Sequence, residues 1–245
     1  MIAVKLGGSV ITDKRRECCY RADVAQRLAR EMAAADEAIL VVHGAGSYGH
    51  PQAERYRLQH GGGPDILEGV AVTHAAVRDL NLRLLKALHQ AGIAAVSLPP
   101  FPSLDDSYIR RARDTVEAGL TPVTFGDVLI KPEVAIVSGD VLMQRLSAGL
   151  STRRAIFVTN VDGILRDPAR PDTLIARCTP DELSGATFDG VDGADVTAGM
   201  AGKVKAIKEM AYSGIDVAVI NGGEAGRLQR ALRGDVHGTV VSIHE

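Results

Sequence analysis

The chain has 245 residues, of which 46% are hydrophobic, enough for one large α/β unit or two small ones. Because 28 basic residues nearly balance 30 acidic ones and no basic block stands out, the charge pattern argues against nucleic acid or a membrane surface as a partner. The first residues read directly as a strand, without the basic region and apolar core of a signal peptide, and no apolar run approaches membrane-spanning length. We therefore expect a cytoplasmic protein.

The cysteine and aromatic content excludes further classes. The three cysteines are Cys18, Cys19 and Cys178, and adjacent Cys18 and Cys19 are poorly placed for a structural disulfide or a tetrahedral metal site. We assign no residue to a metal site. Tryptophan is absent and aromatic residues make up 4% of the chain, which removes the stacking platform of single-strand nucleic-acid binders.

The first strand, residues 2–6, runs into a glycine turn between two lysines. Lys5 is near the end of the strand, Gly7-Gly8-Ser9 forms the turn, and Lys14 follows shortly after. Two lysines around such a turn could reach one phosphate group. The alternative is that Lys5 extends from the strand to solvent and that Lys14 lies in a solvated loop.

A second strand ends in another glycine loop. Helical periodicity over residues 21–35 leads to a buried strand at 38–42, so the segment reads as a βαβ unit with both glycine loops at one sheet edge. The loop, His43-Gly-Ala-Gly-Ser-Tyr-Gly-His50, precedes a helix start. Small residues between a strand and a helix form a phosphate cradle, although a plain structural turn is equally compatible with this motif alone.

The remaining segments continue the alternation of strands and helices. We expect a helix to about residue 58, a glycine break, a long helix at 66–91 and a strand at 93–98. Residues 105–114 read as irregular or weakly helical, and 121–137 as a β-hairpin or an edge ribbon. Strands at 135–137, 155–159, 216–221 and 239–243 and helices after 140, after 203 and at 225–232 complete the pattern.

Polar or small residues follow the later strands. Ser138-Gly139-Asp140 opens a helix, and Asp140 is either a helix cap or a catalytic residue. Asn160-Val161-Asp162-Gly163 follows a buried strand, at the end where open α/β sheets bind ligands. The stretch from Asp195 to Lys203 places a lysine at a helix start but lacks the P-loop pattern.

Taken in order, these motifs resemble the amino acid kinase superfamily over nearly the whole chain. The resemblance implies an α/β fold, a three-layer αβα sandwich with a mainly parallel central sheet. It also implies a single domain, residues 1–245, with a phosphate-acceptor half at about 1–150 and an ATP-binding half at about 151–245. Within the superfamily, the histidine that closes the loop, His50, is similar to that of archaeal-type isopentenyl phosphate kinases.

The resemblance also implies roles for individual residues. His50 and Lys14 match the family's acceptor-phosphate histidine and transition-state lysine, and with Lys5 they are the expected catalytic residues. Ala45, His50 and Gly139 are expected to bind the acceptor. The expected nucleotide-binding residues are Lys5, Leu6, Gly7, Gly8, Ser9, Gly46, Asp162, Gly199 and Lys203.

Two positions depart from the family pattern. Ala45 replaces a glycine of the acceptor loop, and Ala198 replaces a glycine of the Thr-Gly-Gly-Met motif in the nucleotide half. A backbone N–H remains at Ala45 provided that its φ is negative. Neither change removes a functional side chain, so we expect activity to be retained.

The implied activity is ATP-dependent phosphorylation of isopentenyl phosphate in isoprenoid supply, with ATP and Mg²⁺ as cofactors. The expected partners are this small substrate and a second copy in a homodimer, with no nucleic acid and no membrane. A kinase for another phosphate or phosphonate, such as fosfomycin, is the nearest alternative. A nucleotide- or oxyanion-binding protein without turnover is the alternative from another class.

Overall fold

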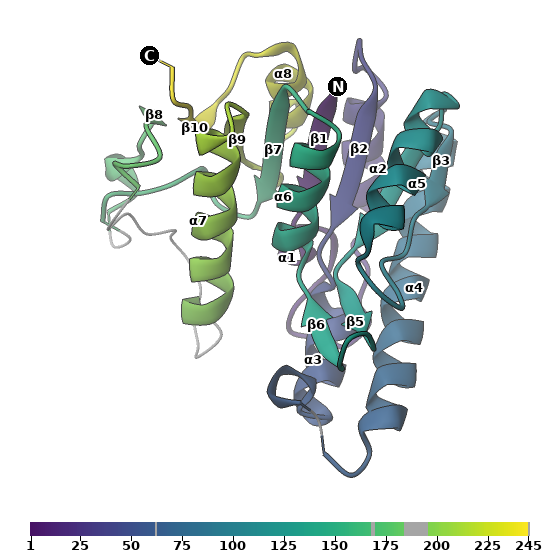
Figure 1. Ribbon diagram of the computed structural model, residues 1–245. Helices are drawn as coiled ribbons and strands as arrows, with labels where there is room; N and C mark the ends of the chain where they lie inside the picture. The colour runs from purple at the N-terminus through teal and green to yellow at the C-terminus, as the bar shows by residue number, and fades with distance from the viewer. Residues whose placement is uncertain (62, 168–169, 184–195, 245) are drawn as a thin grey trace.

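A mostly parallel sheet forms the middle layer of the computed structural model, which describes residues 1–61, 63–167, 170–183 and 196–244 (Figure 1). Its strands are β1 (Ile2–Leu6), β2 (Ile39–His43), β3 (Ala95–Ser97), β4 (Thr121–Phe125), β7 (Arg154–Thr159), β8 (Arg177–Cys178), β9 (Asp216–Asn221) and β10 (Gly238–Val241). Across the described residues the order is β3-β4-β2-β1-β7-β9-β10-β8. Only the β9–β10 pair of these is antiparallel.

Helices cover both faces of this sheet. They are α1 (Gly8–Ile11), α2 (Ala22–Met32), α3 (Gly46–Arg55), α4 (Ile66–Gln90), α5 (Asp106–Glu117), α6 (Gly139–Gly149), α7 (Val196–Tyr212) and α8 (Arg227–Arg233), with 3₁₀ turns η1 (Leu58–His60) and η2 (Pro171–Thr173). Apolar residues of α2, α4 and α8 pack on one face, and those of α5, α6 and α7 pack on the other. The three-layer αβα fold with a mainly parallel sheet is confirmed.

The alternation of side chains along β1 decides which layer each residue enters. All five residues of β1 are buried, as is usual for a parallel strand covered on both faces. Ile2, Val4 and Leu6 join the core with α2 and α4, whereas Ala3 joins the core with α6 and α7. Because Lys5 shares the face of Ala3, its side chain enters the α6–α7 layer.

Two expectations from the sequence are wrong in detail. Residues 106–117 form helix α5, whose buried contacts come mainly from Tyr108 and Ala112, so an apolar stripe is hard to detect in so polar a segment. The 121–137 segment is not one ribbon, because β4 lies between β3 and β2 in the main sheet. Only β5 (Asp127–Leu129) and β6 (Ala135–Val137) form an antiparallel hairpin.

The hairpin and two helices extend past one end of the sheet. In Figure 1 the β5–β6 hairpin, α3 and the first half of α4 lie beyond the end of the sheet opposite the chain's N-terminus. Since β1 begins at that N-terminus, these segments lie at the carboxyl end of the parallel strands. No helix among the described residues is long and apolar enough to cross a membrane.

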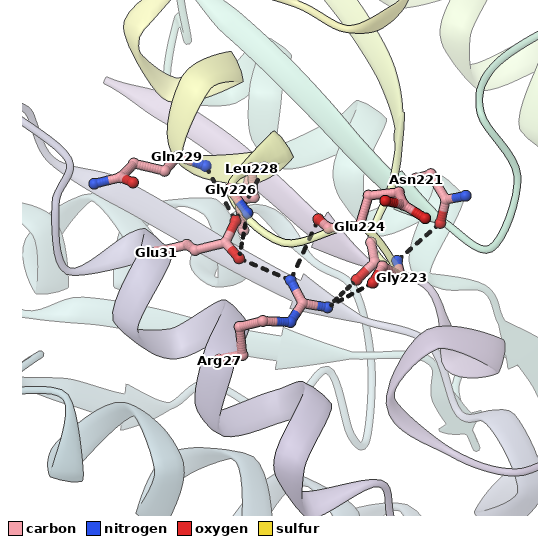
Figure 2. A network of polar contacts seen from close by, with 9 residues as sticks. Arg27, Glu31, Asn221, Gly223, Glu224, Gly226, Leu228 and Gln229 are labelled. Atoms are coloured by element: carbon pink, nitrogen blue, oxygen red, sulfur yellow. Dashed lines mark hydrogen bonds and ion pairs between the residues drawn. The ribbon is translucent and has the colours of Figure 1, made fainter.

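A buried ion pair joins α2 to the loop between β9 and α8, as Figure 2 shows. Glu31 lies 2.7 Å from Arg27 and accepts hydrogen bonds from three backbone N–H groups at the start of α8, those of Gly226, Leu228 and Gln229, at 3.0–3.3 Å. Arg27 donates to the carbonyl groups of Gly222, Gly223 and Glu224. The pair therefore attaches α2 to a distant loop, and Glu31 accepts from N–H groups that the start of α8 leaves without a partner inside the helix.

We predict that Glu31→Ala lowers the free energy of unfolding by about 2–4 kcal/mol, because three backbone N–H groups at the start of α8 lose their acceptor and Arg27 loses its carboxylate partner. The matched control is Asp79→Ala, which breaks an exposed i,i+4 pair with Arg83 and should cost less than about 1 kcal/mol. Denaturant unfolding of both variants measures the difference. Equal losses of unfolding free energy in the two variants would show that the contacts of Glu31 stabilise the fold no more than an exposed ion pair does.

Candidate active site

Three loops follow strands that lie next to one another in the sheet. In the parallel register, Leu6 at the end of β1 is opposite His43 at the end of β2 and Val158 near the end of β7. Three loops therefore start at the carboxyl end of these neighbouring strands: 7–9 after β1, 44–46 after β2 and 160–163 after β7. This end of the sheet is the position at which open α/β sheets bind ligands.

The first two loops touch through their backbones. A Cβ atom at Gly8 would lie 2.5 Å from the nitrogen of Gly46, and one at Gly44 would lie 2.7 Å from the nitrogen of Gly8. Gly46 also has a φ of +50°, which disfavours other residues. Close approach therefore requires glycine at these positions of both motifs, and the backbones of the two loops lie against each other.

Thr12 connects the two loops. Its buried hydroxyl group donates to the carbonyl of Gly8 at 2.7 Å and accepts from the N–H of Ser47 at 3.0 Å. The sequence analysis did not single out Thr12, since a threonine just after a helix carries no recognisable signal. The hydroxyl group therefore joins the two glycine loops.

Lys5 forms a buried ion pair with Asp140 on α6. The Lys5 Nζ atom lies 2.5 Å from Asp140 Oδ1, and the two side chains are 8% and 13% exposed. Burial lowers the pKa of Lys5, opposed by the attraction of Asp140. Burial would raise the pKa of Asp140, yet the nearby cations Lys5 and Lys203 bring it below its ordinary value. A paired, ionised carboxylate is therefore held beneath the glycine loops.

Asp140 is not the residue that caps α6. Ser138 caps α6, since its hydroxyl group accepts from the N–H of Val141 at 3.3 Å. Asp140 instead binds Lys5. Lys203, on α7, is close enough to act electrostatically on both members of the pair. The structure therefore brings Lys5 and Lys203, two of the predicted residues, together around Asp140.

The predicted acceptor residues Ala45 and Gly139 lie near one glycine. A Cβ atom at Gly126 would lie 3.2 Å from the nitrogen of Gly139 and 3.8 Å from that of Ala45. Ala45 has a φ of −70°, which meets the condition set for its backbone N–H. Helices α3 and α6 both begin here, so the positive ends of their dipoles face the same place. Gly126 was not predicted, because nothing in its local sequence marks it.

His50 lies on the exposed side of α3. The helix begins at Gly46, so His50 is the fifth helical residue and stands one turn along from Gly46 on the same face. The next residue, Pro51, has no N–H to bond the carbonyl of Ser47, four residues earlier. That carbonyl accepts instead from the N–H of Cys18 at 3.0 Å.

Lys14 is exposed on the loop that this contact attaches to α3. Besides the Cys18 bond, the N–H of Cys19 donates to the Ser47 hydroxyl group at 3.2 Å. The loop that carries Lys14 is therefore fastened on both of its sides, by Thr12 and by the two cysteines, to the first turn of the helix that carries His50.

Two of the predicted nucleotide residues, Gly7 and Ser9, contact β7 and the loop that follows it, on the other side of β1 from β2. The Ser9 hydroxyl group is 3.4 Å from Asn160, and the N–H of Gly7 donates to Val158 at 2.8 Å, so the first loop also contacts the loop after β7. Asp162 there pairs with Arg227 at 2.5 Å.

Two other predicted nucleotide residues lie at the end of β1 and at the start of α7. Leu6 is packed in the core and its carbonyl accepts from Gly44, and Gly199 and Ala198 lie in the first turn of α7. Asp195 lies outside the described residues. The nucleotide-binding roles of all these residues stay predictions.

One further ionisable pair lines the end of the molecule beyond the sheet. His74 on α4 lies 2.8 Å from Asp127 on β5 and packs on the ring of Phe101 at 4.4 Å between centroids. Burial raises the pKa of Asp127 to about 6, although His74 acts in the opposite direction. The local sequence around His74 could not predict its buried partner Asp127, which is 53 residues away in the chain.

Comparisons with known proteins agree with this arrangement. A family model described as the amino acid kinase family matches residues 1–221. The isopentenyl phosphate kinase of Methanothermobacter thermautotrophicus is 34% identical over 267 residues, covering 99% of each sequence. That of Thermoplasma acidophilum is 33% identical, covering 98% of this chain and 100% of the relative. A crystal structure of an isopentenyl phosphate kinase substrate complex gives a TM-score of 0.81 at 28% identity, covering 98% of this chain and 100% of its own.

We predict that Thr12→Val lowers the free energy of unfolding by about 1–3 kcal/mol, because valine leaves the Ser47 N–H without its acceptor and removes one of the two donors to the Gly8 carbonyl. Amide hydrogen exchange at Ser47 should become faster. Thr12→Ser, which keeps the hydroxyl group, is the control and should stay close to the parent in both measurements. Unchanged exchange in the valine variant would show that Thr12 does not hold the loops together.

The pair of His74 and Asp127 predicts a dependence of stability on pH. Because the pKa of Asp127 rises from 3.8 to about 6 on folding, the folded state keeps a proton that the unfolded state releases. The free energy of unfolding should therefore fall as pH rises from about 4 to 6, by up to about 3 kcal/mol.

Asp127→Asn removes this titration while keeping an oxygen that accepts from the N–H of Val128. The variant should gain stability relative to the parent between about pH 4 and 6, as measured by thermal unfolding across that range. Parallel pH profiles for the two proteins would show that Asp127 titrates normally.

Proposed function

Because the chain belongs to the amino acid kinase family, we propose that it transfers the γ-phosphoryl group of ATP to isopentenyl phosphate, giving isopentenyl diphosphate. The observation that carries this proposal is the buried Lys5–Asp140 pair beneath two glycine loops, with His50 one helical turn beyond the second loop. Relatives named isopentenyl phosphate kinase, similar to the chain over nearly its full length, support the choice of acceptor.

The acceptor phosphate is proposed to bind at the starts of α3 and α6. The backbone nitrogens of Ala45 and Gly139 lie near Gly126. Their N–H groups would donate to the oxygens of the acceptor phosphate, together with the imidazole of His50. An acceptor phosphate oxygen is already ionised near neutral pH, so the reaction needs no general base. The residues here act by placing the attacking oxygen in line with the donor.

The transferring phosphoryl group is proposed to lie between the two glycine loops. Lys5, whose ammonium group is held in place by Asp140, would neutralise the charge of the phosphoryl group. Lys14 would approach the same group from the loop that is attached to Ser47. The N–H groups of Gly8 and Gly46 would donate to its oxygens. These contacts stabilise charge that spreads over the transferring oxygens in the transition state.

The ATP phosphates are proposed to bind toward the second half of the chain. Lys203, whose charge already acts on Lys5 and Asp140, would hold them from α7. The residues proposed to surround the nucleotide are Leu6, Gly7, Ser9, Asp162 and Gly199.

The described residues contain no group of three or more metal-ligating side chains. We propose that Mg²⁺ is bound through the ATP oxygens and water, where it supplies further charge neutralisation.

Broader assignments complete the proposal. The acceptor half would be about residues 1–150 and the nucleotide half about 151–245 of one domain. We further propose that the reaction belongs to the mevalonate pathway and that its product supplies isoprenoid synthesis. The homodimer and the cytoplasmic location expected from the sequence stay predictions.

The first experiment is a coupled ADP-release assay with ATP and Mg²⁺, in which isopentenyl phosphate, fosfomycin and acetylglutamate are compared. Turnover of isopentenyl phosphate alone is the expected result. Turnover of fosfomycin instead would assign the chain to the phosphonate-kinase alternative. ATP binding without turnover of any acceptor would favour the non-catalytic alternative.

We predict that His50→Ala lowers kcat/KM for isopentenyl phosphate about 100-fold, because one donor to the acceptor phosphate is lost, while the KM for ATP changes less than about twofold. The matched control is His244→Ala, an exposed histidine after β10, at the opposite end of the sheet. Its kinetics should equal those of the parent. Unchanged acceptor kinetics in the His50 variant would contradict the role of His50.

A further inference from the structure

A chain of polar groups runs from the second glycine loop through α4 to β3, with His43 and Asn81 buried and Ser97 exposed. His43, the last residue of β2, is fully buried and stacks on Phe125 at 5.2 Å between ring centroids. Its Nδ1 atom lies 3.1 Å from the carbonyl oxygen of Gly44, and its Nε2 atom lies 3.2 Å from Nδ2 of Asn81. The Oδ1 atom of Asn81 accepts from the Ser97 hydroxyl group at 2.7 Å.

The proton positions in this chain follow from what each group can do. A carbonyl oxygen only accepts, so Nδ1 of His43 must carry the proton that faces Gly44. Burial lowers the pKa of His43 to about 4, so the ring is neutral at neutral pH and Nε2 is bare. Nε2 therefore needs a donor, which is the amide group of Asn81, and the Asn81 oxygen is left to accept from Ser97.

The bond to Gly44 orients the next peptide group. In a planar trans peptide the C=O of one residue and the N–H of the next point in opposite directions. Because His43 holds the carbonyl oxygen of Gly44, the N–H of Ala45 points away from the His43 ring. On that side Gly126 lies next to the nitrogens of both Ala45 and Gly139. The imidazole of His43 thus determines the direction of the Ala45 N–H group.

We propose that His43 is a positioning residue for the acceptor phosphate. Asn81 and Ser97 select its Nδ1–H tautomer, and that tautomer aims the N–H of Ala45 at the phosphate. The link to the acceptor rests on the proposed function, whereas the tautomer is a property of the protein alone. This arrangement also gives a reason for three polar residues to be placed in or beside an otherwise apolar layer between β2 and α4.

Nitrogen-15 NMR of the histidine side chains tests the tautomer directly. The signals of His43 are identified by their absence from the spectrum of His43→Asn. We expect a proton on Nδ1 and a bare Nε2 throughout the range from about pH 5.5 to 8. A proton on Nε2, or protonation of both nitrogens in this range, would overturn the proposal, whatever the substrate of the chain proves to be.

Kinetics of two matched variants test the effect on the acceptor. His43→Asn places an amide N–H near the position of Nδ1 and should keep the KM for isopentenyl phosphate within about threefold of the parent. His43→Leu removes the donor and should raise this KM about tenfold or more, with the KM for ATP unchanged. Equal KM values in the two variants, or equal losses for both substrates, would overturn the proposal.

Asn81→Leu provides a third variant that leaves His43 in place. It removes the donor to Nε2, so the spectrum should show a mixture of both tautomers and the KM for isopentenyl phosphate should rise. A pure Nδ1–H tautomer in this variant would show that Asn81 does not select it. If the unaltered chain turns over no isopentenyl phosphate, the proposed function fails, and the spectra alone decide the role of His43 and Asn81.

Discussion

The site depends on a contact between two stretches of bare backbone. The loops after β1 and β2 approach so closely that a Cβ atom at Gly8 or Gly44 would overlap the other loop. Side chains could not produce this geometry, because none fits between the loops. Their surroundings hold them in place: Thr12 bonds to both, His43 orients the peptide after Gly44, and Ser47 fastens the loop that carries Lys14. Backbone N–H groups are thereby concentrated where an anion can approach them.

Charge is organised around the same contact. Lys5 enters the α6–α7 layer because of its place in the alternation of β1, and there it meets Asp140 and the field of Lys203. A buried lysine without a carboxylate would lose its proton or remain in water. The pair is therefore a structural requirement for keeping a cation beneath the loops. A second ion pair, between Arg27 and Glu31, attaches α2 to the loop after β9.

The sequence was sufficient for the strand and helix order and for the residues that belong to contiguous motifs. Lys5, Gly8, Ala45 and Gly46 stand next to strand ends, where periodicity and small residues are informative. Thr12, Gly126 and the partners of His43 could not be predicted, because their roles arise from contacts between segments far apart in the chain. Asp140 remained ambiguous for the same reason, since a helix cap and a partner for Lys5 look alike in one dimension.

The β5–β6 hairpin lies outside the main sheet and, with α3 and α4, contributes to a separate small core that includes Ala53, Val70 and Val128. None of these residues takes part in the contact between the two glycine loops. In the proposed kinase, this core lies beside the acceptor site at Gly126, which directly precedes β5. The range of accepted molecules could therefore change, during evolution or in the laboratory, through residues that do not take part in that contact.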